Sequence, residues 1–309
     1  MYVSVEISVI IATRNRSDVL LRCLHTLAEQ TVKPAELIII DASDELPDHD
    51  RVLSLQQLLK APLLWEKAIV HGAAAQRNQG MKKSNFPFVL FMDDDVYLQA
   101  DVIKKLWDGM QRPGTGAVSS MITNQRYTAP GKLSRYMYRL MSGKRLDSYA
   151  GLVIGPAWNL LPEDRETLPE YVRCEWLNTT CTLYRKSLMP DPVFSSHFHG
   201  YSLMEDVTLS LQIGKSAILL NARTARIYHD SQPGSHKNNP AEIASMQLVN
   251  RYFVMTKIMN RSSFSDKLKL AALEVFGTIT SLRTARNVLI LPRVLYGKMK
   301  GVYQIITSS

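Results

Sequence analysis

Three consecutive aspartates, Asp93, Asp94 and Asp95, directly follow the apolar run at 88–92 and form the strongest chemical signal in the sequence. Adjacent carboxylates repel one another, so they require a cation or full solvation. Two acids separated by one residue can present oxygens to a hard divalent cation, which also holds phosphate oxygens. A solvated acidic turn that begins the next helix is the alternative. This motif alone leaves both interpretations open.

The elements around these acids follow a regular alternation. We expect strands at 3–12, 37–40, 64–70, 88–92 and 117–121, with helices at 17–30, 51–60, 73–83 and 100–110, the first of them capped by Ser17. Strands that alternate with helices imply an α/β fold with a doubly wound, mostly parallel sheet flanked by helices. In such sheets ligands bind beyond the carboxyl ends of the strands.

The alternation of strands and helices is interrupted over 124–172, which contains glycines, prolines and a basic cluster. Beyond this insert we expect a strand at 175–184, a helix at 203–213, strands at 217–220 and 224–228, and helices from 241 with a break at Pro292. The sequence therefore predicts a domain at 1–235 and a basic helical C-terminal extension at 236–309.

The charge is unevenly distributed along the 309 residues. Residues 236–309 carry 11 Lys and Arg against three acids, a net charge of +8, whereas the rest of the chain has a net charge of +1. A nucleic-acid function would need a basic field over the main body, so we expect none. The three cysteines, Cys23, Cys174 and Cys181, show no CxxC spacing, which indicates free thiols in a reducing cytosol.

Four motifs occur in a fixed order: SVIIATRNR, IIIDASD, GAAAQRNQG and FMDDDV, each at the end of an expected strand or the start of a helix. This pattern resembles the family 2 glycosyltransferases, which use nucleotide sugars and have the GT-A fold. The resemblance covers roughly the first 235 residues. It implies a GT-A-type sheet followed here by the C-terminal helical extension.

The resemblance assigns a group of residues to the nucleotide-sugar donor. Thr13 and Arg14 match the turn that borders the nucleobase, and Asp41 matches the acid that accepts a hydrogen bond from the base. Arg77 and Asn78 match the Arg-Asn pair of the family. The planar guanidinium of an arginine at this position can donate hydrogen bonds to the diphosphate or to the nucleobase. An Asx turn at Asp41 and an ordinary exposed helix arginine at Arg77 are the alternatives.

The metal ligands follow from the same resemblance. Asp95 matches the metal ligand, Asp93 matches a residue near the ribose or the metal, and Asp94 could share either duty. His229 matches a third metal ligand or a diphosphate contact, with a buried structural histidine as the alternative. These ligands suit Mn²⁺ or Mg²⁺, Mn²⁺ more naturally because of the imidazole.

The acidic pair Glu205 and Asp206 lies where the family has its catalytic base. An acceptor hydroxyl is a poor nucleophile near neutral pH, so a carboxylate must take its proton, and Asp206 is the expected base. Direct displacement then inverts the anomeric configuration. Charge compensation at a helix N-terminus is the alternative. Met204 stands where relatives often have Thr or Gly.

Three residues are expected near the acceptor. Trp176 and Asn178 fall in a strand that floors the acceptor pocket in relatives, although core packing explains Trp176 equally well. His199, with His197, precedes the acidic pair. The HxH spacing has no further cysteine or acid to complete a closed zinc site.

The tail over 264–300 combines an apolar helical stripe with flanking lysines and arginines. This pattern is typical of a helix at an anionic membrane surface. Packing on its own domain, or on a protein partner, remains the alternative. The start of the chain resembles a strand and not an export signal, and no run reaches about 18 apolar residues, so we expect a cytoplasmic protein, peripheral on the inner face of the plasma membrane.

The sequence thus predicts an inverting glycosyltransferase that moves a sugar from a UDP- or dTDP-linked donor to a hydroxyl of a glycan or lipid-linked glycan, in bacterial-type polysaccharide or glycoconjugate assembly. A non-catalytic nucleotide-sugar or glycan-binding protein of the same fold is one alternative. A metal-dependent nucleotidyltransferase is another, but such enzymes usually have a glycine-rich loop after the first strand, and ATRNRSD contains no glycine.

Overall fold

The computed structural model of the protein describes residues 3–198, 200, 202–232, 239–282 and 284–307. The chain divides into two compact units: unit 1 comprises Met1–Tyr127 and Leu161–Gln232, and unit 2 comprises Thr128–Leu160 and Pro233–Ser309. Unit 1 therefore differs from the domain expected at 1–235 by the segment 128–160 and by the last three residues, 233–235. That segment belongs with the C-terminal helices because Trp158 packs against the guanidinium of Arg251, 4.8 Å from its ring, and against Gly277.

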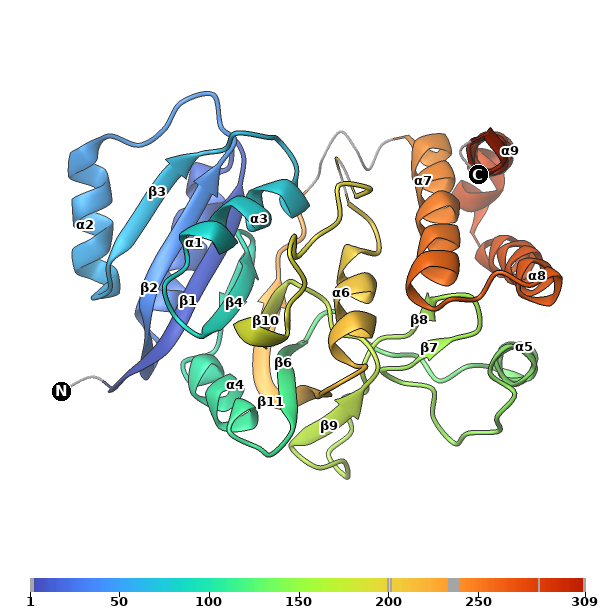
Figure 1. The fold of residues 1–309 in the computed structure, drawn as a ribbon, viewed down its shortest axis with the longest axis horizontal. Coiled ribbons are helices and arrows are strands. Elements are labelled where there is room, and N and C mark those ends of the chain that lie inside the picture. The colour runs from blue at the N-terminus through green and yellow to red at the C-terminus, as the bar shows by residue number, and fades with distance from the viewer. Residues whose placement is uncertain (1–2, 199, 201, 233–238, 283, 308–309) are drawn as a thin grey trace. The chain divides into compact units, whose positions relative to one another are not determined.

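Unit 1 is built on one mixed sheet (Figure 1). Its first four strands are parallel, in the order β3-β2-β1-β4, and beyond β4 the order continues β10-β6-β11-β5, with β9 also paired to β11. In this second half β10 runs antiparallel to both neighbours, β11 is parallel to β6, and β9 and β5 are antiparallel to β11. The strands are β1 (Val3–Thr13), β2 (Val32–Asp41), β3 (Leu63–Lys67), β4 (Phe88–Asp93), β5 (Val96–Leu98), β6 (Thr115–Ile122), β9 (Tyr171–Cys174), β10 (Cys181–Arg185) and β11 (Ile218–His229).

Helices cover both faces of this sheet, as the sequence predicted. Val9 and Ile11 of β1 join the apolar sides of α1, α2 and α4 in one buried cluster. Ile10, which points to the opposite face, meets α3, where a Cβ on Gly80 would come within 2.5 Å of the Ile10 Cγ2 atom. Gly80 therefore lets α3 lie directly on the strands. The helices of unit 1 are α1 (Ser17–Ala28), α2 (His49–Leu59), α3 (Ala73–Lys83), α4 (Val102–Met110) and α6 (Glu205–Ile213), with a 3-10 turn at Lys186–Leu188.

Three sequence expectations about unit 1 need correction. Ser17 is the first residue of α1 and not its cap, because the cap position falls on Arg16. The strand expected at 175–184 is present only from Cys181 onward, as β10, and residues 175–180 lie in no strand. The chain needs this stretch to cross from β9, which pairs with β11, to β10, which pairs with β4. The strands expected at 217–220 and 224–228 are a single strand, β11, whose register shifts between Ala222 and Arg226.

Unit 2 consists of helices and a short hairpin. It contains α5 (Lys132–Ser142), β7 (Val153–Ile154), β8 (Trp158–Asn159), α7 (Pro240–Phe253), a π-helical turn (Val254–Ile258), α8 (Phe264–Ser281) and α9 (Ala285–Thr307). The break expected at Pro292 does not occur, and α9 continues through it. Pro292 and Val288 are both exposed, so water can satisfy the carbonyl that loses its helical partner. Within the described residues, no helix has the length and apolar character needed to cross a bilayer.

Two glycines allow α9 to approach α7 closely. A Cβ on Gly297 would lie 2.1 Å from the carbonyl oxygen of Ala241, and one on Gly301 would lie 3.1 Å from that of Ser245. Both glycines are buried and stand four residues apart, on one face of the helix. The backbone of α7 occupies the space that side chains would need.

Substitution Gly297→Ala tests this contact. The added methyl collides with backbone that cannot rotate away, so we expect the free energy of unfolding to fall by about 1–3 kcal/mol. The measurement is urea unfolding followed by circular dichroism. Gly131→Ala is the control without a clash: its Cβ meets nothing within 4 Å, so only the weaker N-cap of α5 costs stability, and we expect a loss below about 1 kcal/mol. Equal stability of the two variants would contradict the close approach.

Candidate active site

The ends of three parallel strands bring acids to one edge of the sheet. In the β1–β2 pairing Thr13 lies opposite Asp41, and in the β1–β4 pairing Ala12 lies opposite Asp93. Parallel strands end on the same side, so Thr13, Asp41 and the aspartate triplet share the carboxyl edge, where α/β proteins bind their ligands. The strand pairing thus brings together residues that lie far apart in the sequence.

The middle aspartate of the triplet points into the protein. Asp94 is 5% exposed, and it accepts hydrogen bonds from Thr13 Oγ1 at 2.7 Å and from Arg16 Nη1 at 3.3 Å. Burial raises the pKa of Asp94 to about 6, against the lowering effect of Thr13. Asp94 therefore ties the first strand to the triplet and leaves Asp93 and Asp95 to face His229.

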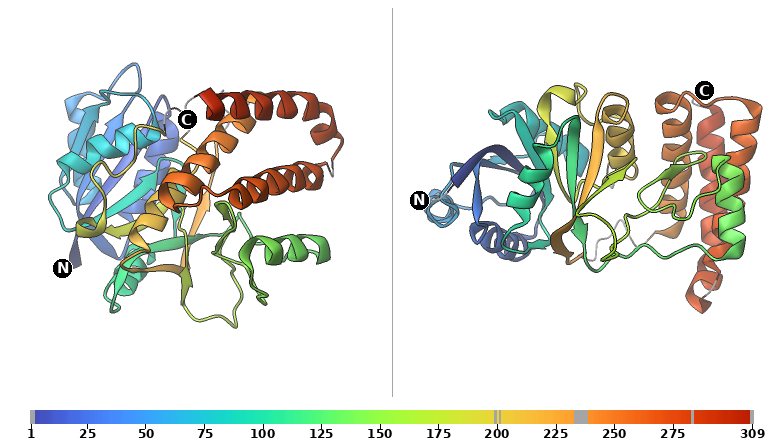
Figure 2. Two further views of the ribbon diagram at one scale, coloured as in Figure 1. Left: turned by 45° about the vertical axis from the view of Figure 1, so that its right-hand side comes forward. Right: turned by 90° about the horizontal axis from the view of Figure 1, so that it is seen from below.

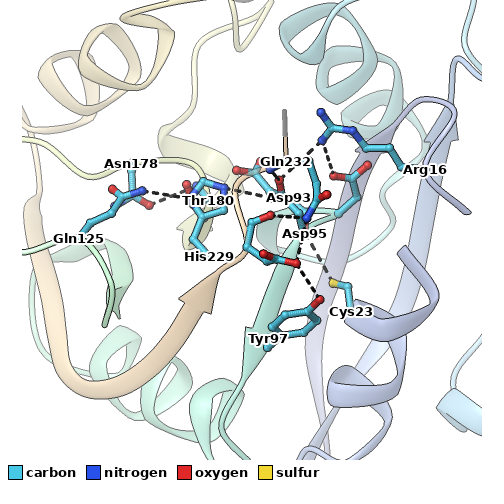
Figure 3. A network of polar contacts seen from close by, with 12 residues as sticks. Arg16, Cys23, Asp93, Asp95, Tyr97, Gln125, Asn178, Thr180, His229 and Gln232 are labelled. Carbon is cyan, nitrogen blue, oxygen red and sulfur yellow. Dashed lines mark hydrogen bonds and ion pairs between the residues drawn. The ribbon is translucent and has the colours of Figure 1, made fainter. Parts of the chain in front are cut away.

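Asp93, Asp95 and His229 form a group that fits a divalent cation. One ligand atom from each of these three residues lies within 4.8 Å of the other two (Figure 3). His229 ends β11 opposite Val96 of β5, which places its Nε2 atom 3.1 Å from Asp95 Oδ1. Two carboxylates and an imidazole are a donor set that suits Mn²⁺ and also serves Mg²⁺.

Neighbouring groups orient these ligands. Gln125 Nε2 lies 3.1 Å from His229 Nδ1, and the backbone N–H of Gln232 donates to Asp95 Oδ2 at 3.3 Å (Figure 3). Burial alone would raise the pKa of Asp95, but the hydrogen bond and charge of His229, with Gln232 and Arg16, hold it below its usual value. The carboxylate is thus kept ionised, as a metal ligand must be.

Arg77 joins the triplet to the second acidic pair. Its Nη2 atom donates to Asp93 Oδ1 at 2.6 Å, and its Nη1 atom donates to Glu205 Oε1. Arg77 and Glu205 are 4% and 6% exposed, so this ion pair is almost fully removed from water. Burial alone would lower the pKa of Arg77, but Glu205 and Asp93 raise it above its ordinary value. One buried guanidinium therefore holds α3, β4 and α6 together.

The acidic pair begins α6, directly after an unusual backbone conformation. Met204 has a φ of 72°, in the left-handed region that favours glycine. This conformation turns the chain into α6. Asp206 is partly buried, its Oδ1 atom accepts from the N–H of Val207 at 2.7 Å, and burial raises its pKa to about 6. Burial also raises the pKa of Glu205, to about 7.

A cavity of about 590 Å³ lies at the carboxyl ends of β1 and β2. Thr13, Arg16, Asp41 and Trp65 contribute to its wall. The carboxylate of Asp41 accepts from Trp65 Nε1 at 3.0 Å and from the N–H of Ser43 at 2.7 Å, which fixes its orientation. The Ser43 contact is the Asx turn considered as the alternative for Asp41, and it coexists with a place in the cavity wall.

The other residues expected in the site lie in different surroundings. Arg14 is exposed, and the amide of Asn78 makes two hydrogen bonds to the backbone of Phe194, at 2.7 and 2.9 Å. Trp176 is 5% exposed, which favours its role in packing over stacking on a sugar. Asn178 is partly exposed and accepts from the N–H of Thr180, whereas His199 lies outside the described residues.

Sequence reasoning missed three residues of this region. Arg16 contacts both Asp94 and Asp95, Trp65 holds Asp41, and Gln125 contacts His229. Arg16 stands in the ATRNRSD turn, so its basic character beside the strand end was a usable signal. Trp65 and Gln125 offered no such signal in the sequence. Their partners, Asp41 and His229, lie 24 and 104 residues away and come close only through the pairing of strands.

Comparison with known proteins identifies the family. Residues 8–189 match the model of glycosyl transferase family 2, a span that includes the second half of β1, the triplet and β10. The chain belongs to glycosyl transferase family 2. A relative from Campylobacter jejuni, GalNAc(5)-diNAcBac-PP-undecaprenol beta-1,3-glucosyltransferase, is 22% identical over 227 residues, which are 72% of this chain and 64% of that protein. The chain spans less than two thirds of the length of the curated relatives that it matches first.

Solved structures share the fold of this family 2 protein. A mannosyltransferase of Pyrobaculum calidifontis, solved with GDP-Man and Mn²⁺, superposes with a TM-score of 0.56 at 11% identity over 97% of this chain and 87% of that chain. S. aureus TarS 1-349, solved in complex with UDP-GlcNAc, superposes with a TM-score of 0.56 at 15% identity, and the match covers 95% of this chain and 79% of that chain. The expected GT-A fold is confirmed.

The metal group generates a prediction for Asp95→Ala. Loss of one of the three ligands should remove the Mn²⁺-dependent part of nucleotide binding. Thermal shift with UDP, with and without Mn²⁺, measures this as the difference in Tm shift between the two conditions. Asp108→Ala, an exposed acid on α4, is the control and should keep the full difference. An unchanged Mn²⁺-dependent shift in Asp95→Ala would contradict the ligand assignment.

The buried bridge generates a second prediction. Arg77→Met leaves Glu205 buried without its cation, and we expect the free energy of unfolding to fall by roughly 3–5 kcal/mol. Adding Glu205→Gln to that variant should restore much of the loss, because the uncompensated charge is gone. Urea unfolding of the two single variants and the double variant gives the coupling energy. The same double-mutant cycle on the exposed pair Lys83–Glu66 is the control and should give a far smaller coupling energy. If the changes in the free energy of unfolding at Arg77 and Glu205 were strictly additive, the bridge would be ruled out.

Proposed function

We propose that this family 2 protein is an inverting, metal-dependent glycosyltransferase that moves a sugar from a UDP- or dTDP-sugar to an acceptor hydroxyl. The observation that carries the proposal is the Arg77 bridge, because it places the acidic pair of α6 beside the candidate metal group. Transfer requires both parts at one place: a group that holds the diphosphate and a base that faces the sugar.

The cavity beside β2 suits the nucleoside of the donor. Asp41 in its wall offers carboxylate oxygens, which can accept a hydrogen bond from the ring N–H of uracil or thymine. Arg16 lies in the same wall and contacts Asp94 and Asp95, so its charge lies between the cavity and the triplet. We infer that the base occupies the cavity and that the diphosphate extends past Arg16 toward Asp93.

Asp93, Asp95 and His229 would hold Mn²⁺ or Mg²⁺ beside the diphosphate. When bound, the cation neutralises the charge that develops on the leaving nucleoside diphosphate. The protein's own contribution is to keep these ligands ionised and oriented. Gln125 does this at His229, and the N–H of Gln232 does it at Asp95.

Asp206 is the proposed general base. The acceptor hydroxyl gives its proton to the Asp206 carboxylate while its oxygen forms a bond to the anomeric carbon, and the bond from that carbon to the diphosphate oxygen breaks. Attack opposite the leaving group inverts the anomeric configuration. A pKa raised to about 6 makes Asp206 a stronger base than an exposed aspartate, yet leaves it mostly ionised at neutral pH. Glu205 is held by Arg77 and positions the start of α6.

For the acceptor we propose a glycan or a lipid-linked glycan in bacterial-type polysaccharide or glycoconjugate assembly. The support is the Campylobacter jejuni relative, whose name specifies an undecaprenol diphosphate-linked acceptor. Such an acceptor would be used in the cytoplasm, at the inner face of the plasma membrane.

Incubation with a panel of nucleotide sugars, Mn²⁺ and lipid-linked acceptors tests the reaction class. A glycosyltransferase releases nucleoside diphosphate and forms a glycoside with inverted configuration, which NMR of the product detects. A binding protein of the same fold would release nothing, and a nucleotidyltransferase would exchange pyrophosphate. Either of these results, or a retained configuration, would refute the proposal.

For Asp206→Asn we expect kcat to fall by roughly 10²–10⁴-fold with nearly unchanged donor affinity, because the variant lacks only the proton acceptor. Asp164→Asn, which removes a carboxylate paired with Arg226 away from the site, should leave both values near wild type. Since the base must be deprotonated, wild-type kcat at saturating Mn²⁺ should fall about tenfold per pH unit below pH 6 and level above it. Wild-type turnover in Asp206→Asn would exclude this residue as the base.

A further inference from the structure

The exposed side of α9 is apolar although its opposite side is buried. Gly297 and Gly301 face α7, and the residues half a turn away around the helix are exposed. Leu289 is 80% exposed and Tyr303 is 69% exposed. Large apolar residues continue along this side over almost the whole helix: Val288, Leu289, Leu295, Tyr296, Met299, Val302, Tyr303 and Ile306.

Basic residues border this apolar side along one edge. Arg286, Arg293 and Lys300 are exposed and recur every seven residues, so they form a line along the helix. They lie between the glycine side and the apolar side. Such a helix has three longitudinal strips, one packed on α7, one basic and one apolar.

The same combination occurs on α8. Leu270, Leu273 and Phe276 are buried, whereas a second set of apolar residues faces outward: Phe264, Leu268, Ala271, Val275 and Ile279. The spacing of four, three, four and four residues keeps this set on one side of the helix. Lys267 is exposed and Lys269 is partly exposed beside it.

Helix α5, from the insert, repeats the pattern. Leu133, Tyr136 and Leu140 are 54–67% exposed and fall on one side of the helix. Lys132, Arg135 and Arg139 are exposed next to them. These bases belong to the basic cluster of the 124–172 insert.

These three helices form one layer within unit 2. Figure 1 shows α9, α8 and α5 nearly end-on, one above another, and in Figure 2 the same three helices run in similar directions. We call them the basic–apolar layer. Of 22 large apolar side chains that are exposed among the described residues, 15 belong to this layer, although unit 2 is the smaller unit.

The charge of unit 2 matches the composition of this layer. Unit 2 contains 16 Lys and Arg against four acids, a net charge of +12, whereas unit 1 contains 21 against 24, a net charge of −3. A soluble monomer rarely exposes so much apolar surface, and a basic border selects a negatively charged partner. The tyrosines and phenylalanine on the outer sides, such as Tyr136, Tyr296 and Phe264, are residues that favour a membrane–water interface.

We propose that the basic–apolar layer binds the surface of an anionic phospholipid bilayer, with the apolar strips entering the headgroup region and the basic residues contacting lipid phosphates. None of the described helices can span a membrane, so the contact is peripheral. A second copy of the chain is a poorer occupant because two units of charge +12 repel each other. The proposed surface extends beyond the tail expected at 264–300, since it includes α5 and the end of α9.

Co-sedimentation of the full chain with vesicles tests this surface without donor or acceptor, so its result is independent of the transfer reaction. We expect binding to vesicles of phosphatidylcholine with phosphatidylglycerol and little binding to phosphatidylcholine alone. Neutralising three exposed bases of α9 should weaken the partition coefficient on the order of 100-fold. The variant is Arg286→Gln/Arg293→Gln/Lys300→Gln, and the matched control on unit 1 is Lys82→Gln/Arg126→Gln/Lys215→Gln.

A second pair of variants isolates the apolar part. Removing three exposed apolar side chains should weaken partitioning at least about tenfold, since each one loses its burial in the headgroup region. The variant is Leu268→Gln/Leu289→Gln/Tyr303→Gln, and its control on unit 1 is Leu53→Gln/Ile69→Gln/Val70→Gln. All replaced residues are exposed, so we expect the helices to persist, and circular dichroism of each variant is the check.

Three results would overturn the proposal. One is failure of the wild-type chain to sediment with the anionic vesicles. Another is equal binding of the wild type and both layer variants. The third is a dimer in sedimentation velocity that the apolar variant dissociates while vesicle binding is absent, which would assign the layer to a second copy. Loss of binding in the layer variants but not in their controls would support it.

Discussion

The compensation of clustered carboxylates organises the site of this protein. Asp93, Asp94, Asp95, Glu205 and Asp206 gather at the carboxyl edge of one sheet, and so much like charge is unfavourable unless each acid has a partner. Asp94 is held by Thr13 and Arg16, Asp95 by His229, and Asp93 with Glu205 by a single buried guanidinium. These contacts give the acids different roles: Asp94 and Glu205 hold the structure together, Asp93 and Asp95 face the candidate metal position, and Asp206 is the proposed base. The same contacts that reduce the repulsion between the carboxylates therefore also arrange them for the proposed reaction.

The sheet makes this sorting geometrically possible. Parallel β1, β2 and β4 deliver Thr13, Asp41 and the triplet to one edge, while β11 reaches that edge through β5 to supply His229. Gly80 allows α3 to sit on the strands, which brings Arg77, three residues earlier on the same helix, within reach of Asp93. The left-handed Met204 then turns α6 so that its first residue meets Arg77 from the other side.

The two units divide the surface chemistry between them. Unit 1 has nearly balanced charge and holds the candidate site. Unit 2 carries the net positive charge, and its helices α5, α8 and α9 carry most of the exposed large apolar side chains. A protein that transfers sugar to a lipid-linked acceptor would need both a polar site for a nucleotide and a means of staying at the bilayer. Separate units let each requirement be met without weakening the other.

The amino-acid sequence was sufficient to predict the features that arise from local interactions. The alternation of strands and helices predicted β1, β4 and α3 nearly to the residue. The ordered motifs singled out Asp41 and the triplet, and the family resemblance singled out the Glu205–Asp206 pair. Tertiary structure alone decided which of these acids are paired, since Arg77 reaches Glu205 across 128 residues. It also decided that Trp65 orients Asp41, that β9 and β10 are separate strands, and that 128–160 joins the C-terminal helices. Each of these outcomes depends on contacts between segments far apart in the chain, for which periodicity and propensity carry no signal.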